Sequence, residues 1–95
     1  MKVKIQYFAS VRELINLREE TLDLESGSTV EDLLGLLATK HGEKLGGYLF
    51  DPETGKPRSY LQFLLNQQSI SALNGLSTLL ADGAVFAIIP PVGGG

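Results

Sequence analysis

From Lys2 the chain alternates between polar and apolar side chains, which is the pattern of a half-buried β-strand, until Phe8 adds an apolar residue on the otherwise polar face. Val3, Ile5 and Tyr7 would share one face of this strand, and the polar residues between them the other. A second alternating run at 21–25 predicts a neighbouring strand, with residues 12–17 as a short connection. The two runs lie close enough in sequence to pair, and an antiparallel pair is expected.

An amphipathic helix is the clearest element that follows. Its apolar residues recur at the spacing i, i+3, i+4 and i+7, namely Val30, Leu33, Leu34 and Leu37. Ser28 and Glu31 match an S-x-x-E capping box, so the helix is expected to start there. Lys40 and His41 would lie in its last turn, where a basic side chain interacts well with the helix dipole. Gly42 follows at the position where a left-handed cap forms most easily.

Turn-forming residues dominate the stretch after this helix. Residues 43–59 contain paired glycines and prolines, and predict an exposed excursion with a short turn of helix near 45–50. Residues 60–66 predict a third strand. The side chains expected on one face of that strand are Leu61, Phe63 and Leu65.

The last part of the chain predicts turns and then a final strand. Residues 72–80 are apolar but interrupted by Asn74-Gly75, and are expected to form turns or a single helical turn. Asp82-Gly83 predicts a tight turn into a strand at 84–89.

The order of these elements favours an α+β fold of the β-grasp (ubiquitin-like) type. Its mixed sheet would contain four to five strands packed on one main helix. The first and last strands are the most apolar, so they are expected to lie side by side in the middle of the sheet. Residues 1–95 are predicted to form a single domain, with 90–95 as a flexible C-terminal tail.

Composition and charge narrow the range of functions. A net charge of −3 with no clustered basic face argues against nucleic-acid binding, and no apolar run is long enough to cross a membrane. The absence of cysteine excludes disulfides and thiolate chemistry, and fits a cytoplasmic protein. His41, the lone histidine, has no second ligand at metal spacing. With no triad, paired carboxylates or phosphate-binding glycine loop, independent catalysis and a bound cofactor are not expected.

The C-terminal sequence IIPPVGGG combines a strand end, two prolines and three glycines. Pro90 and Pro91 cannot donate ladder hydrogen bonds, and their fixed φ favours an extended exit from the domain. The six residues from Pro90 would reach about 20 Å, and glycines can enter a tunnel too narrow for side chains. The terminal carboxylate needs activation before it can transfer a group. The alternative interpretation is a frayed end without function.

Three stretches of the sequence resemble the MoaD/ThiS family of ubiquitin-like sulfur carriers, and its MoaD branch in particular. YFASVRELIN at 7–16 is similar to the family's F-A-x-[LV]-R-E-L, and LLNQQSI at 64–70 occupies the place of its V-N-x motif. LADGAVFAIIPPVGGG at 80–95 is similar to the family's L-x-D-G-D-x-V-x-[IF]-x-P-P-V-x-G-G ending. The resemblance implies that the chain is the non-catalytic small subunit of a molybdopterin synthase.

This resemblance implies a chemistry located at Gly95. A MoeB-like enzyme would use ATP to adenylate the Gly95 carboxylate, and a sulfur donor would convert it to a thiocarboxylate. Inside a MoaE-like large subunit, the sulfur would be transferred to cyclic pyranopterin monophosphate. Gly94 would be the second glycine of the required pair.

The same resemblance implies a set of residues that contact these partners. They are Phe8, Arg12, Ile70, Ile89, Pro90, Pro91, Val92 and Gly93, with Phe63 considered for the same surface but expected in the core. Three other functions fit the same sequence. The first is a ubiquitin-like protein modifier conjugated through Gly95, and the second is a sulfur carrier for thiamine or tRNA thiolation. The third is a passive binding module with a frayed tail.

Overall fold

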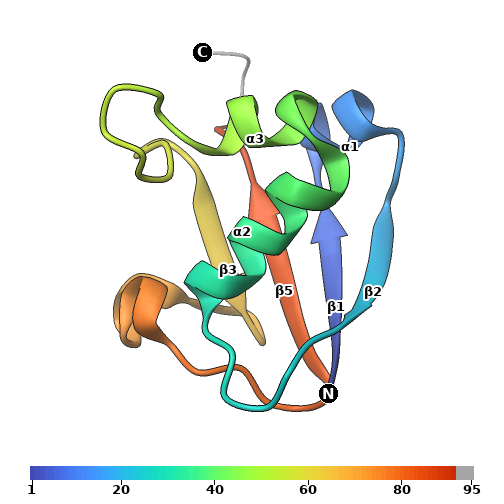
Figure 1. Cartoon of the computed structure of the whole chain (residues 1–95), viewed down its shortest axis with the longest axis vertical. Helices are drawn as coiled ribbons and strands as arrows, with labels where there is room; N and C mark the ends of the chain where they lie inside the picture. Colours follow the sequence, from blue (N-terminus) through green and yellow to red (C-terminus); the bar gives the residue numbers. More distant parts are fainter. Residues whose placement is uncertain (92–95) are drawn as a thin grey trace.

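The computed structural model of the chain describes residues 1–91, which contain a five-stranded sheet. Figure 1 shows α2 crossing one face of this sheet. The strand order is β2-β1-β5-β3-β4. The strands are β1 (Lys2–Tyr7), β2 (Glu19–Asp23), β3 (Gln62–Leu65), β4 (Gln68–Ser69) and β5 (Ala84–Ile89). The helices are α1 (Ala9–Ile15), α2 (Val30–His41) and α3 (Glu43–Leu49), with 3₁₀ turns at Ile70–Ala72 and Gly75–Ser77. This is the predicted β-grasp fold.

The two most apolar strands, β1 and β5, pair in parallel at the centre of the sheet, as predicted. Tyr7 lies opposite Ile88 at the end where both strands finish, and both side chains are fully buried. The apolar residues of β1 and β5 on this face pack against the stripe of α2. That core includes Val3, Ile5, Phe86, Leu33, Leu34 and Leu37.

The second strand pairs antiparallel to β1, as expected, but it begins earlier than the sequence pattern indicated. The pairing runs from Lys2 opposite Asp23 to Gln6 opposite Glu19. Because the hydrogen-bonded ladder continues to the end of β1, β2 starts two residues before position 21. The sequence pattern does not indicate this extension, because Glu19 and Glu20 are both charged and do not continue the alternation of apolar and polar residues.

The connection predicted at 12–17 is instead the second half of a helix, α1, and the following turn. Val11 is fully buried and fixes α1 onto the core. Asn16 ends the helix in the left-handed conformation, with φ 58° and ψ 39°, and its N–H donates to the carbonyl of Arg12. Asparagine tolerates this conformation better than most residues. A seven-residue helix with a single fully buried side chain gives too little periodicity to predict.

The start of α2 lies one residue later than the Ser28 box predicted. Thr29 is the N-cap, and it exchanges hydrogen bonds with Asp32 in a complete capping box. The Ser28 hydroxyl donates to the carbonyl of Glu25 at 2.7 Å instead. The apolar stripe is buried as predicted. Gly42 follows the helix with a positive φ of 71°, but its ψ of −161° lies outside the left-handed helical region, so the predicted left-handed cap is wrong.

The short turn of helix predicted near 45–50 is α3, which begins at Glu43, but the exposure predicted for this part of the 43–59 segment is wrong. Leu45 and Leu49 are fully buried, and the helix packs closely on α2. A Cβ added at Gly46 would lie 3.4 Å from the Cβ of Ala38, so glycine allows this approach. The loop after α3 is mostly exposed, as predicted.

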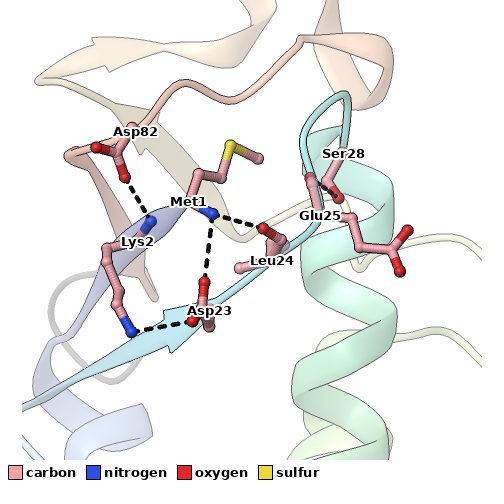
Figure 2. Close-up of polar contacts among 7 residues, drawn as sticks. All are labelled: Met1, Lys2, Asp23, Leu24, Glu25, Ser28 and Asp82. Carbon is pink, nitrogen blue, oxygen red and sulfur yellow. Dashed lines mark hydrogen bonds and ion pairs between the residues drawn. The ribbon is translucent and has the colours of Figure 1, made fainter.

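A polar cluster fixes the start of the chain against the end of β2 and the turn before β5 (Figure 2). The Met1 amino group donates to the carbonyl of Leu24 at 2.8 Å and lies 3.2 Å from Asp23 Oδ1. The backbone N–H of Lys2 donates to Asp82 Oδ1 at 2.7 Å. Hydrogen bonds from Lys2 and the amino group lower the pKa of Asp23. These contacts hold the predicted Asp82-Gly83 turn, where Gly83 has a φ of 82°.

Among residues 1–91, no helix has the length and apolar character needed to span a bilayer. Nor does that part of the chain bring together three or more histidine, cysteine or acidic side chains in an arrangement that could hold a metal ion.

Candidate docking face and C-terminal exit

The last strand leads directly to the C-terminal segment, at the end of which the sequence predicts the reactive carboxylate. β5 ends at Ile89, which is half-buried, and Pro90 after it is buried while Pro91 is exposed. Pro90 is therefore part of the packed domain and offers a partner little surface, in contrast to the expectation of a free tail from 90 onward. Val92, Gly93, Gly94 and Gly95 lie outside the described residues.

An apolar patch covers the sheet face that is turned away from α2. Successive side chains of a strand point to opposite faces, so the residues of β3 and β5 that do not face α2 appear here, and Ala87 is the buried member of this set. Ala87 lies between Gln6 of β1 and Leu64 of β3, and Ile89 lies opposite Gln62. The residues of this apolar patch are Phe8, Leu64, Val85, Ala87 and Ile89. They line a hollow of about 530 Å³ together with Gln6, Asn66 and Gln67.

Phe8 is the most prominent member of the patch, and its side chain is 40% exposed. It follows β1 directly and serves as the N-cap position of α1, where its carbonyl accepts hydrogen bonds from Val11 and Arg12. Ala9, the next residue, has a φ of 50°, a conformation that costs a non-glycine residue about 1–2 kcal/mol. The turn from β1 into α1 therefore presents an exposed aromatic ring at the border of the patch.

Asn66, which the sequence predictions did not assign to the site, holds the edge of the patch. It lies in the turn between β3 and β4, where it and Gln67 both have positive φ, as two-residue hairpins of this type require. Its N–H donates to the carbonyl of Val85 at 2.8 Å, and its Oδ1 accepts from the N–H of Val85 at 2.9 Å. The asparagine thus continues the β3–β5 ladder by one residue with its side chain. The available signal was an asparagine, a common turn residue, directly after the apolar run of β3.

The structure separates the other predicted contact residues. Arg12 is exposed on α1 beside Phe8, at the border of the patch. Ile70 is a buried core residue and does not line the hollow at the apolar patch, so the structure does not bring it together with Phe8. Phe63 is a core residue, as interpreted, and stacks on Phe86 with 5.7 Å between ring centroids.

A polar cluster around Glu20 joins the sheet to the end of α2. The Glu20 side chain is 9% exposed and receives Lys40 Nζ at 2.6 Å on Oε1. Its Oε2 accepts from the Tyr7 hydroxyl at 2.6 Å and lies 2.6 Å from His41 Nε2. The sequence placed His41 in the last helical turn correctly, but its contact with β2 required the tertiary fold.

The groups of this cluster change each other's ionisation. Burial of the Glu20 carboxyl opposes its ionisation, but hydrogen bonds from Lys40, Tyr7 and His41 outweigh burial, so the pKa of Glu20 is lowered. Burial, then the hydrogen bond and the charge of Glu20, raise the pKa of Tyr7 above its ordinary value of 10.0. The cluster therefore contains an ionised carboxylate and a neutral phenol at neutral pH. It fastens the fold and does not open onto the patch.

Comparisons of sequence and of structure with known proteins agree on one family for this chain. The sequence model of the ThiS family matches residues 5–95. The chain is 30% identical to small archaeal modifier protein 3 of Haloferax volcanii and 33% identical to the molybdopterin synthase sulfur carrier subunit of Chlamydomonas reinhardtii. Each alignment covers 100% of both chains. The crystal structure of SAMP1 from Haloferax volcanii superposes with a TM-score of 0.87 at 26% identity, covering 100% of each chain.

Proposed function

This chain belongs to the ThiS family and is a small sulfur carrier or ubiquitin-like modifier, and from that premise we propose that it carries sulfur for molybdenum cofactor biosynthesis. In this proposal Gly95 is adenylated, thiocarboxylated and used as a sulfur donor inside a molybdopterin synthase. The protein works inside the cell as a cosubstrate, and the partner subunits supply the catalytic side chains.

The observation that carries the proposal is that one strand connects the docking face to the tail. β5 contributes Val85, Ala87 and Ile89 to the apolar patch and then leads through Pro90 to Pro91. A partner that covers the patch must therefore lie beside the point where the tail begins. Buried Pro90 fixes the direction of that exit, because its φ is locked near −65° and its side chain is packed.

The patch is suited to a protein partner. It combines the exposed ring of Phe8 and the half-buried side chains of Leu64, Val85 and Ile89 with the amide groups of Gln6, Asn66 and Gln67, which is a typical mixture for a protein–protein interface. Phe8 is an aromatic residue at its border and therefore a candidate for a large share of the binding energy. We propose that a MoeB-like activating enzyme and a MoaE-like large subunit use this surface in turn.

The chemistry at Gly95 requires a defined sequence of steps. An oxygen of the carboxylate attacks the α-phosphorus of ATP bound to the activating enzyme, pyrophosphate leaves, and an acyl adenylate forms. Hydrosulfide released by the donor then attacks the acyl carbon, AMP leaves with the bonding electron pair, and the thioacid loses its proton to water. The product is a thiocarboxylate whose sulfur is the nucleophile toward cyclic pyranopterin monophosphate. Glycines at the end of the tail avoid the steric conflict that β-carbons would cause in a narrow tunnel.

Reconstitution tests this function. The thiocarboxylated chain is incubated with a MoaE-like large subunit and cyclic pyranopterin monophosphate, and formation of the dithiolene product is measured. Product is expected in proportion to the thiocarboxylate supplied, and none with the unmodified chain. A thiocarboxylated chain that forms a complex with the large subunit but yields no product would contradict the assignment to this pathway.

A second candidate function is protein modification, and the alignment with small archaeal modifier protein 3 over the full length of both chains favours it. The same activated Gly95 would then form isopeptide bonds with lysine side chains. Proteolytic digests of cells that express the chain would contain lysines carrying its C-terminal glycine remnant. If cells that lack a MoaE-like subunit still accumulate such remnants, the modifier function is supported; sulfur transfer to thiamine or tRNA would give none.

A further inference from the structure

A second hollow adjoins the apolar patch and contains two arginines. It has a volume of about 330 Å³ and shares Gln6 and Phe8 with the apolar hollow. Its other lining residues are Tyr7, Arg12, Arg18 and Glu19. Phe8 therefore lies between an apolar surface and a charged one. We call the second the arginine hollow.

The backbone of the chain brings the two arginines to the same place. The N–H of Arg12 donates to the carbonyl of Phe8 at 3.4 Å, at the start of α1. The left-handed Asn16 then reverses the chain, and the carbonyl of Arg18 accepts a hydrogen bond from Tyr7 at 2.9 Å. Both residues are thus attached to the last two residues before α1, although six positions separate them in sequence.

Neither guanidinium is neutralised within the described part of the chain. Both arginines are exposed and form no ion pair there, whereas Lys2 and Lys40 are each paired with a carboxylate. The guanidinium of Arg58, the third arginine, donates to the carbonyl of Gly47 at 2.9 Å. Glu19 is the one acidic residue among the lining residues, so two positive charges face one negative charge. In a chain of net charge −3, this excess of positive charge beside an apolar patch is distinctive.

We propose that the arginine hollow binds a carboxylate side chain of the protein partner that covers the apolar patch. A guanidinium presents its N–H donors in a planar fork that fits a carboxylate, and two such groups favour an anion strongly when the surrounding interface excludes water. The partner surface then has an apolar side chain in contact with Phe8 and an aspartate or glutamate next to it. This inference rests on the proposed function, because it deepens the description of the same docking face.

A ligand titration tests the hollow independently of any enzyme. Succinate serves as the carboxylate probe, and the side-chain Nε–H signals of the three arginines are followed by NMR in the full-length chain. Saturable shifts are expected at Arg12 and Arg18, with Arg58 as the internal control that changes little. The R12Q/R18Q double variant, followed at the Phe8 backbone N–H, should lose the saturable component. Equal shifts at all three arginines, or the same shifts with sodium chloride at matched ionic strength, would overturn the proposal.

The same titration with inorganic phosphate tests whether the arginine hollow binds a phosphate group in preference to a carboxylate. Tighter binding of phosphate than of succinate at Arg12 and Arg18 would assign the hollow to a phosphate-bearing ligand and would also overturn the proposal.

Activation kinetics test the role of the hollow in the complex. With a MoeB-like enzyme that adenylates the wild-type chain, R12Q/R18Q should raise KM about tenfold and leave kcat unchanged, because the arginines act in docking. The K44Q/K56Q double variant is the matched control, since it removes two exposed charges elsewhere and should leave KM within about twofold. Equal KM values for the two double variants would refute the inference. Failure of the wild-type chain to be adenylated would instead count against the proposed function and leave the titration as the deciding test.

Discussion

Nε2 of His41, in the last turn of α2, lies 2.6 Å from Oε2 of Glu20 on β2. The same carboxylate also receives Lys40 and the hydroxyl of Tyr7, so one side chain connects the helix with two strands of the sheet. The Tyr7 and His41 rings meet edge to face, with 6.3 Å between their centroids. Glu20 is therefore expected to contribute to stability well beyond an ordinary surface ion pair.

Replacing Glu20 with glutamine should lower the free energy of unfolding by about 1–3 kcal/mol, the usual cost of weakening a largely buried, charge-assisted cluster. Urea unfolding at pH 7 measures the effect. Glu19→Gln is the matched control. The Glu19 carboxylate, next to Glu20 in the sequence, is exposed and forms no ion pair in the described structure. A Glu20→Gln variant as stable as Glu19→Gln would show that the cluster contributes nothing.

The contribution of Glu20 should also depend on pH. Its pKa in the folded protein is lowered, so its stabilisation is complete above the ordinary value of 4.5 and is lost as the pH falls through the folded-state pKa. The difference in unfolding free energy between the wild-type chain and Glu20→Gln should therefore shrink below about pH 4.5. A difference that stays constant from pH 7 to pH 3 would contradict the assigned ionisation.

Replacing Asn66 with glycine should destabilise the fold more than replacing it with aspartate. Glycine keeps the positive φ but removes the oxygen that accepts from the Val85 N–H, which should cost about 1 kcal/mol. Aspartate keeps an acceptor at that position and should cost less. Hydrogen exchange at the Val85 amide gives the most local measurement. Faster exchange in Asn66→Gly than in Asn66→Asp is expected, and equal rates would show that the side-chain hydrogen bond is unimportant.

Phe8→Ala should weaken docking without unfolding the domain. Since the ring is 40% exposed, its removal should change the unfolding free energy by less than about 1 kcal/mol. If the ring is an anchor of the interface, KM for a MoeB-like activating enzyme should rise at least about tenfold. Leu79→Ala is the control, because Leu79 is 66% exposed and does not line the hollow at the apolar patch. Equal effects of the two substitutions on KM would exclude Phe8 as an anchor.

The regular parts of the fold could be predicted because their burial repeats along the sequence. Alternation in β1 and the stripe of Leu33, Leu34 and Leu37 in α2 reflect one buried face each, so period alone identifies them. The predicted start of α2 differs from the observed start by one residue, because two possible capping boxes overlap in the sequence. Both Ser28 with Glu31 and Thr29 with Asp32 fit the pattern, and only the backbone distinguishes them.

The site was harder to predict because its residues meet only through sheet pairing. Ala87 and Leu64 become neighbours because β3 and β5 pair antiparallel, and no local pattern fixes that register. Ile70 was placed on the surface because a lone apolar residue after a strand gives no sign of its direction. Arg18 gives no signal in the sequence, because its position beside Phe8 depends on the left-handed turn at Asn16.

The most direct test of the central claim is the intact mass of the chain after incubation with a MoeB-like activating enzyme, ATP and a sulfur donor. The account predicts a mass gain equal to the exchange of one oxygen for one sulfur, located at Gly95 by fragmentation. A variant lacking Gly94 and Gly95 should not change in mass. An unchanged mass of the full-length chain, with an activating enzyme that modifies a known carrier in parallel, would contradict the claim that Gly95 carries sulfur.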